Sequence, residues 1–166
     1  MRQTGGKEKT AVIHLGLEAL IQREAARGAG RFDASAGCAD APAQRKEKMR
    51  ILEDTSIWIN HFRRSDSQLV QALSQQQVLM HPIVIGELAT GNLRDRPGIL
   101  ADLQALPHVQ EVTFTESLSF LEIHQLYARG LGWSDIQLLG SALLNGVSLW
   151  SSDKRLEAAA RELRLR

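Results

Sequence analysis

The chain has 166 residues, of which 43% are hydrophobic and 23% are charged, and its formal net charge is +1. The length is typical of one domain with a small appendage, and the composition is typical of a packed globule rather than a disordered chain. No apolar run approaches the roughly 20 residues that a membrane-spanning helix needs, and the N-terminus lacks the pattern of a secretory signal. We therefore expect a cytoplasmic protein without membrane contact.

The charge is unevenly distributed along the chain. Residues 1–48 carry 9 basic and 6 acidic side chains, a balance of +3, whereas residues 49–166 carry 11 and 13, a balance of −2. This change predicts a basic N-terminal segment, 1–48, joined to a mildly acidic domain, 49–166. Opposite charges would favour contact between the two, although isolated surface charges are often only solvated.

Within the N-terminal segment, residues 7–27 place apolar side chains on a broad helical face. Residues 28–48 are instead rich in Gly, Ala, Ser, Asp and Pro. This composition indicates an extended stretch, which is either a flexible linker or an arm that docks on a surface.

Residues 49–166 alternate short apolar runs with amphipathic stretches. Strands are predicted at 51–54, 78–80, 109–114 and 146–150. Helices are predicted from 55, at 65–74, from 82, at 97–106, from a cap at Thr115 to about 129, at 135–144 and at 154–163. Such alternation predicts an α/β fold with a parallel sheet of four to five strands flanked by helices.

Two of the predicted strands end in an acid, Asp54 and Asp153. Because the strands are parallel, both acids should emerge at the same edge of the sheet, where ligands bind in open α/β folds. Asp is also an ordinary helix cap, so each residue taken alone has a purely structural explanation.

Glu87 and Asp135 are two further candidates. Glu87 lies in an apolar helix, where a carboxylate needs a partner, a proton or a metal unless it faces the surface. Asp135 follows Ser134, which forms a capping-box pattern with Gln137, so Asp135 is predicted at the first helical position. It is either a first-turn acid stabilised by the helix dipole or part of a site.

If these four acids converge, a cation must offset their repulsion. Carboxylate oxygens select hard ions, so we predict Mg²⁺ or Mn²⁺, and an ion of this kind supports phosphodiester hydrolysis. Asp54 and Asp153 would be direct ligands, Asp135 a ligand directly or through water, and Glu87 a ligand or the group that orients the attacking water. Thr55 and Ser152 are predicted to hydrogen-bond the carboxylates.

The same residues lie in segments that resemble the PIN-domain ribonucleases, specifically VapC toxins of bacterial toxin–antitoxin modules. The matching segments are LEDTSIWI at 52–59, HPIVIGEL at 81–88, GNL at 91–93, GWSD at 132–135 and LWSSDKRL at 149–156. The resemblance implies a PIN-like fold and an endoribonuclease that uses Mg²⁺ or Mn²⁺. It also implies a homodimer or higher oligomer that a cognate antitoxin inhibits.

The N-terminal segment resembles part of a VapB antitoxin, through TGGKEKTAV at 4–12 and LEALIQRE at 17–24. It lacks the first strand and helix of a ribbon-helix-helix domain, so DNA binding by this chain alone is not expected. We hypothesise that Arg31 or Arg45 inserts among the acids, because a guanidinium matches carboxylates, while Phe32 anchors the arm. Whether the antitoxin contact forms in cis or in trans is left open.

Two functions remain for such a chain. One is a ribonuclease toxin restrained by its own N-terminal segment, acting on RNA. The other is a self-neutralised or decayed fusion that only binds toxins or antitoxins. The tryptophans at 58, 133 and 150 are expected in the core, although an exposed Trp133 beside Asp135 could stack on a base.

Overall fold

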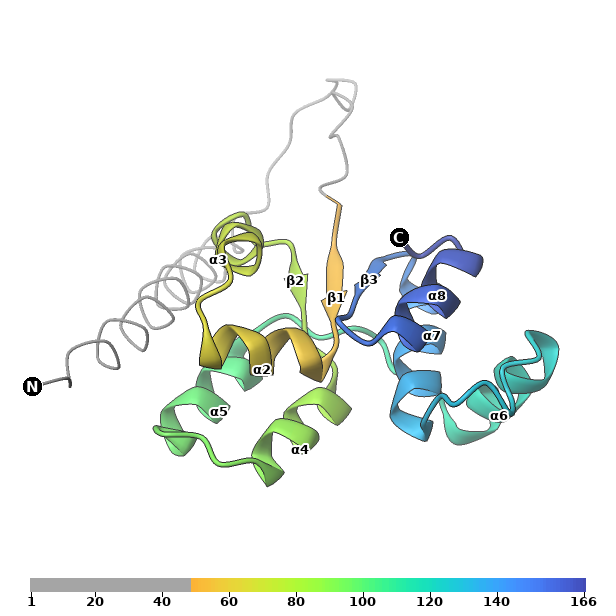
Figure 1. Ribbon diagram of the computed structural model, residues 1–166, viewed down its shortest axis with the longest axis horizontal. Coiled ribbons are helices and arrows are strands. Elements are labelled where there is room, and N and C mark those ends of the chain that lie inside the picture. Colours follow the sequence, from red (N-terminus) through yellow and green to blue (C-terminus); the bar gives the residue numbers. More distant parts are fainter. Residues whose placement is uncertain (1–48) are drawn as a thin grey trace, which may run out of the picture.

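The computed structural model describes residues 49–166 (Figure 1). The predicted helix at 7–27 and arm at 28–48 lie outside these residues, and with them Arg31, Phe32 and Arg45. In the described part a parallel sheet has the strand order β2-β1-β3. Its strands are β1 (Ile51–Glu53), β2 (Val78–Leu79) and β3 (Ser148–Trp150). The predicted α/β fold is confirmed, with three strands in this part rather than four to five.

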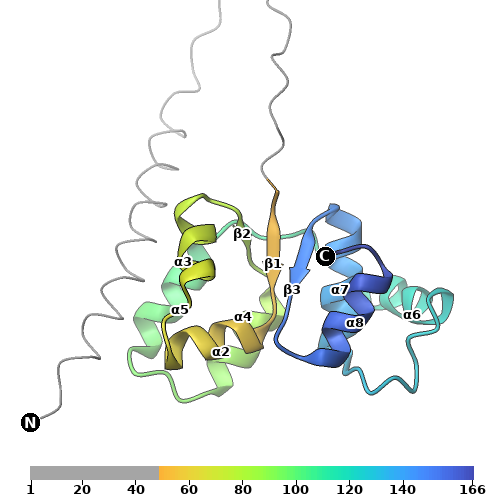
Figure 2. The same ribbon diagram turned by 45° about the horizontal axis from the view of Figure 1, so that its top comes forward.

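Helices flank both sides of this sheet. They are α2 (Thr55–Arg63), α3 (Ser67–Ser74), α4 (Pro82–Thr90), α5 (Arg96–Ala105), α6 (Phe114–Ile123), α7 (Trp133–Asn145) and α8 (Lys154–Glu162). Figures 1 and 2 show α2 to α5 gathered beside β2, and α6 to α8 beside β3. None of the described helices is long and apolar enough to cross a membrane.

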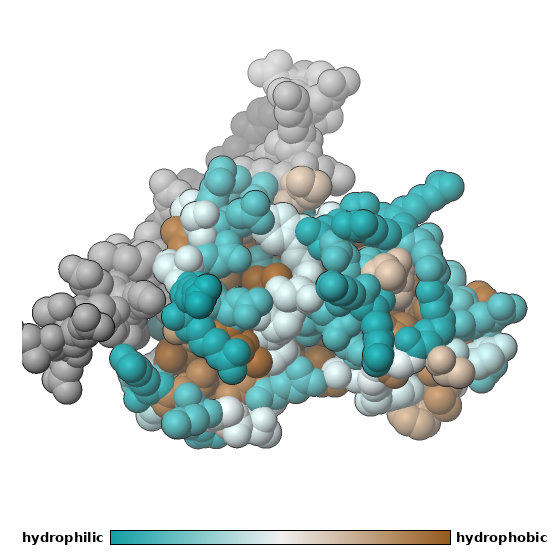
Figure 3. Space-filling view, in the orientation of Figure 1, coloured by the Kyte–Doolittle hydropathy of each residue, from teal (hydrophilic) through white to brown (hydrophobic). Residues whose placement is uncertain are grey.

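Strand β1 lies at the centre of the hydrophobic core. Ile51 and Leu52 are buried, and the indole of Trp58 on α2 packs behind them with no exposed surface. Burying a side chain of this kind stabilises the fold by ~1.5–3 kcal/mol. The outer surface is mostly hydrophilic in the view of Figure 3, with hydrophobic residues showing over α2, α4 and α5.

The predicted strand at 109–114 is wrong. Only an isolated bridge between Met80 and His108 forms there. The chain then stops pairing because Thr113 opens α6 with a capping box: the Glu116 amide donates to Thr113 Oγ1 (3.2 Å), and the Thr113 amide donates to Glu116 Oε2 (2.7 Å). Thr113 rather than Thr115 is therefore the cap, and α6 ends at Ile123 instead of near residue 129.

The start of α7 also differs from the prediction. Gly132, not Ser134, is the N-cap, and the carboxylate of Asp135 accepts a hydrogen bond from the Gly132 amide (2.7 Å). Asp135 is thus the third helical residue rather than the first. At the other end, α7 stops at Gly146, whose φ of 61° is a left-handed conformation that glycine adopts without steric cost.

Candidate metal-binding site

Four acids reach the carboxyl edge of the sheet from four different elements. Asp54 directly follows β1 and caps α2, whereas Asp153 follows the end of β3 and caps α8. Glu87 lies on α4, and Asp135 in the first turn of α7. Because β1 and β3 are parallel neighbours, with Glu53 opposite Trp150, the two strand-end acids share one edge as expected.

Asp54 is held by hydroxyl groups from both strand ends. Its Oδ2 accepts from Ser56 Oγ at 2.6 Å, from Ser151 Oγ at 2.9 Å and from the Ser56 amide at 3.3 Å. The Asp54 amide in turn donates to the Trp150 carbonyl at 2.9 Å. These bonds join the end of β1 to the end of β3 and fix the Asp54 carboxylate. Asp54 is only 8% exposed.

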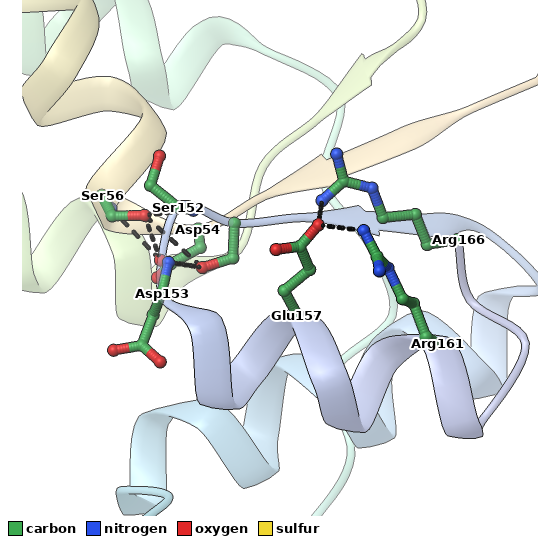
Figure 4. Close-up of polar contacts among 8 residues, drawn as sticks. Asp54, Ser56, Ser152, Asp153, Glu157, Arg161 and Arg166 are labelled. Atoms are coloured by element: carbon green, nitrogen blue, oxygen red, sulfur yellow. Dashed lines mark hydrogen bonds and ion pairs between the residues drawn. The ribbon is translucent and has the colours of Figure 1, made fainter.

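Asp153 is more exposed than Asp54, and its side chain caps α8. Its Oδ1 accepts from the amides of Arg155 (2.7 Å) and Leu156 (3.2 Å), while its own amide donates to Ser151 Oγ (2.9 Å). Figure 4 shows its carboxylate turned away from Asp54. Capping is thus a real role of both strand-end acids, but it occupies one carboxylate oxygen of each.

The other two acids each have a single hydrogen-bond donor. Glu87 is half-buried, and its Oε2 accepts from Thr55 Oγ1, which ties α4 to the first residue of α2. Asp135 Oδ2 accepts from the Gly132 amide. Within residues 49–166 the second oxygen of all four acids has no hydrogen-bond partner.

The electrostatics of Asp135 show that this side chain lies within reach of the charges of the other three acids. The pKa of Asp135 is raised, first because the side chain is partly buried, and further by the negative charges of Asp54, Asp153 and Glu87; the bond from the Gly132 amide opposes this. A negative charge raises the pKa of a carboxyl group when the two are near each other. The structure therefore brings together the four acids that the sequence singled out.

The chemistry of these donors fits a hard divalent ion. The unpartnered oxygens are all carboxylate, which is the ligand type that Mg²⁺ and Mn²⁺ prefer, and a cation would relieve the repulsion felt by Asp135. In the described part of the chain, no three His, Cys, Asp or Glu side chains stand close enough to hold one ion together as they lie. The carboxylates, Asp153 above all, would have to turn toward it.

The hydroxyl groups around Asp54 were predicted only in part. Thr55 does donate to one of the acids, Glu87. Ser152 is one step further away than predicted: its amide donates to Ser56 Oγ (2.9 Å), and its own hydroxyl accepts from Asn60 Nδ2 (2.9 Å). The residues that contact Asp54 are Ser56 and Ser151, and the only signal for them was a hydroxyl residue two positions from each strand-end acid.

A buried histidine connects the helix of Glu87 to that of Asp135, a contact between positions 60 apart that no local pattern predicts. His81 caps α4: its Nδ1 accepts from the Ile83 amide (3.1 Å), so its proton is on Nε2, which donates to Ser141 Oγ on α7 (3.1 Å). Burial lowers the pKa of His81, which a nearby Glu111 opposes. A neutral imidazole thus holds α4 against α7 at neutral pH.

The tryptophans occupy three different environments. Trp58 is fully buried and Trp150 is half-buried, as expected for the core. Trp133 is 40% exposed and pairs with the still more exposed ring of Phe114, with the ring centroids 5.2 Å apart. The core prediction is wrong for Trp133, which lies on the surface two residues before Asp135.

Comparison with known proteins agrees with this arrangement. The PIN domain family matches residues 51–162, which contain all four acids. The chain belongs to the PIN-domain family. Ribonuclease VapC32 of Mycobacterium tuberculosis, from strains CDC 1551 and H37Rv, is 45% identical over 113 residues, which cover 68% of this chain and 91% of the relative.

The N-terminal segment matches a second family. Residues 1–32 match the bacterial VapB antitoxin of type II toxin–antitoxin systems. The chain is therefore a VapC-type PIN protein that carries a VapB-like N-terminus, as the two sequence resemblances predicted.

Proposed function

We propose that this chain is a metal-dependent endoribonuclease toxin of a VapBC module, which hydrolyses phosphodiester bonds of RNA in the cytoplasm. The observation that supports this most is the convergence of Asp54, Glu87, Asp135 and Asp153 at one edge of the sheet, with the raised pKa of Asp135. The match covers 91% of the length of the M. tuberculosis relatives, which are named as ribonucleases.

In this proposal the four acids hold Mg²⁺ or Mn²⁺. When bound, the ion lowers the pKa of a coordinated water and neutralises charge that develops on the phosphate. Asp54 and Asp153 are the direct ligands, and Asp135 binds the ion directly or through water. Ser56 and Ser151 keep Asp54 aimed at the edge, because an outer layer of donors fixes the orientation of a ligand.

Glu87 has a separate role as a ligand or as the group that orients the attacking water. Thr55 occupies its Oε2, so Oε1 remains for a water or an ion. The hydrogen bond also anchors Glu87 to the start of α2, next to Asp54. His81 keeps α4 and α7 in place, and so fixes Glu87 relative to Asp135.

Metal dependence can be tested directly on residues 49–166, which contain the four acids and the described hydrophobic core but not the proposed inhibitory segment. Total bacterial RNA is incubated with the protein in Mg²⁺, in Mn²⁺ and in EDTA, beside Asp54→Asn. The proposal expects cleavage only with the divalent ion and only with Asp54 intact. Cleavage that persists in EDTA or in Asp54→Asn would contradict it.

We propose further that the basic N-terminal segment restrains the nuclease as an antitoxin does, in cis or on a second copy of the chain, which in this family would be a homodimer or higher oligomer. Its net charge of +3 is opposite in sign to the net charge of −2 of residues 49–166, so the two parts attract each other. Arg31 or Arg45 would enter the acid cluster, with Phe32 as an apolar anchor. Tethering would give the arm an effective concentration of roughly millimolar.

The competing function is a silent fusion that only binds toxins or antitoxins, and the VapB-like match at 1–32 favours it. The double variant Arg31→Ala, Arg45→Ala in the full chain separates the two. A restrained nuclease gains cleavage activity and metal affinity, whereas a decayed site stays inactive. If the full chain is active and the double variant has the same cleavage activity and metal affinity, these arginines are not the inhibitory groups.

A further inference from the structure

A polar hollow opens where α2 meets α3, away from the acids themselves. It has a volume of about 610 Å³. Its lining consists of Asn60, Arg63, Arg64, Ser65, Asp66 and Ser67. Figure 3 shows strongly hydrophilic surface over this turn. Two adjacent arginines in one hollow are notable because residues 49–166 are acidic overall, with 11 basic and 13 acidic side chains.

The hollow is connected to the acid cluster through hydrogen bonds. Asn60, on its wall, donates to Ser152 Oγ (2.9 Å), and the Ser152 amide donates to Ser56 Oγ (2.9 Å). Ser56 Oγ is itself a donor to Asp54. A helix rises about 1.5 Å per residue, so the ten positions from Asp54 to Arg64 span roughly 15 Å. A single strand of a few nucleotides covers that distance.

Several other arginines in the described part of the chain are already engaged. Arg129 pairs with Glu162, and both Arg161 and Arg166 pair with Glu157, as Figure 4 shows for the latter two. Arg96 and Arg155 donate to backbone carbonyls instead.

Arg64 differs from these. Its amide donates to the Asn60 carbonyl (2.7 Å), which fixes its backbone, while its guanidinium has no partner among residues 49–166. Its charge therefore remains available at the hollow.

The one acid in the hollow weakens this charge only in part. Asp66 Oδ1 accepts from the amides of Gln68 (2.8 Å) and Leu69 (3.4 Å) and thereby caps α3. The positive end of the α3 dipole partly offsets its charge. The hollow thus holds the guanidinium of Arg64 beside a single carboxylate whose charge is partly offset.

We propose that this hollow is a subsite for a backbone phosphate of the RNA substrate, which Arg64 and Asn60 hold a few nucleotides away from the bond that is cut. The inference rests on the proposed function. A guanidinium binds phosphate through two parallel hydrogen bonds, and the Asn60 amide adds a neutral donor beside it. The subsite would set the register of the strand on the acids rather than take part in the chemistry.

The test measures RNA binding without cleavage. The full chain carrying Asp54→Asn, together with Arg31→Ala and Arg45→Ala to remove the proposed inhibitory contact, is titrated with a fluorescently labelled 12-nucleotide single-stranded RNA over a range of salt concentrations. Adding Arg64→Gln should weaken binding roughly 3- to 10-fold and lower the slope of log K against log salt by about 0.7, the value for one phosphate contact on a single strand.

Two further variants make the result specific to the hollow. Arg164→Gln is the matched control, because Arg164 is an exposed arginine that follows α8, and Figures 1 and 2 place the C-terminal end of the chain beside β3 rather than beside the turn between α2 and α3. It should leave the slope unchanged. Asp66→Asn should strengthen binding, because it removes the only negative charge from the hollow while asparagine still caps α3.

Each outcome can be interpreted. Equal effects of Arg64→Gln and Arg164→Gln, or an absence of RNA binding by the Asp54→Asn parent, would overturn the subsite. The proposed function is judged separately, by divalent-ion-dependent cleavage with Asp54 intact. An active nuclease with no specific effect of Arg64→Gln would therefore disprove this inference alone.

Discussion

Two neighbouring carboxyl groups on β1 occupy opposite environments. Asp54, at the strand end, receives hydrogen bonds from two hydroxyl groups and reaches the edge of the sheet. Glu53 is fully buried, and neither of its carboxyl oxygens has a hydrogen-bond partner. Burial, and to a lesser extent the charge of Asp66, raises the pKa of Glu53 to about 8.

The difference shows that the fold places Asp54 at the edge of the sheet with hydrogen-bond donors and buries Glu53 without any. Successive residues of a strand face opposite sides, so one step along β1 moves a carboxyl group from the edge cluster to the interior. At the edge, the donors of Ser56 and Ser151 hold the Asp54 carboxylate in place. In the interior no donor is provided, so Glu53 is mostly protonated and neutral at pH 7.

The largest expected effect is the difference in RNA cleavage between variants of Asp54 and of Glu53. Asp54→Asn should lower the rate of RNA cleavage by more than about 100-fold, because it removes a proposed ligand of the catalytic ion. Glu53→Gln should leave the rate nearly unchanged. Cleavage of a labelled RNA in Mn²⁺ measures both, and circular dichroism checks that each variant is folded. A loss of similar size in Glu53→Gln would show that the interior carboxyl group also serves the site.

The second prediction concerns the hydroxyl groups that distinguish Asp54. Ser56→Ala combined with Ser151→Ala should weaken Mn²⁺ binding and cleavage by about 10- to 100-fold, because the carboxylate loses the donors that orient it. Calorimetric titration with Mn²⁺ measures the affinity. Ser119→Ala is the control, since Ser119 is an exposed residue of α6. An unchanged affinity in the double variant would mean that Asp54 needs no support.

The third prediction concerns the pH dependence of stability. The folded state holds the Glu53 proton up to a pKa of about 8, whereas the unfolded chain loses it near 4.5, so the stabilisation is complete only below pH 4.5 and disappears as the pH rises through 8. Between pH 7 and 9 the free energy of unfolding should fall by about 1.4 kcal/mol.

Denaturant unfolding at these pH values measures the loss. His61 and His81 do not interfere, because burial lowers their pKa values and they stay neutral over this range. Glu53→Gln should abolish the decline, while Glu122→Gln, at an exposed position of α6, should keep it. A decline that persists in Glu53→Gln would assign it to another group.

The smallest expected effect comes from Asp66, the second cause of the raised Glu53 pKa. Asp66→Asn should lower the pKa of Glu53 and so reduce the decline in stability between pH 7 and 9, without removing it, because burial is the larger cause. Asparagine caps helices about as well as aspartate, so α3 should remain intact. The same unfolding series detects this change. Complete loss of the decline would make charge, not burial, the main cause.

The sequence predicted the four acids because their signals are local. An acid at the end of a buried strand or in the first turn of a helix can be recognised within about ten residues, and parallel strands place the strand-end acids together. The extra strand at 109–114 was predicted because its apolar residues outweighed the capping pattern of Thr113 and Glu116. Ser134 was predicted as the cap of α7 because glycine offers no side-chain signal at position 132.

The contacts around the acids could not be predicted in the same way. Ser151 and Asp54 are 97 positions apart, and His81 and Ser141 are 60 apart, so only the folded chain brings them together. The sequence also cannot distinguish Glu53 from Asp54, because both are acids at the end of one apolar run. Their different roles depend on which side of β1 each side chain faces.

The most direct test of the account is Mn²⁺-dependent cleavage of total bacterial RNA by the full chain and by residues 49–166, whose hydrophobic core runs from Ile51 to Leu165. We predict cleavage by the shorter chain, weaker or absent cleavage by the full chain, and none by either with Asp54→Asn. If neither chain cleaves RNA while both are folded and bind Mn²⁺, the four acids do not form a ribonuclease site.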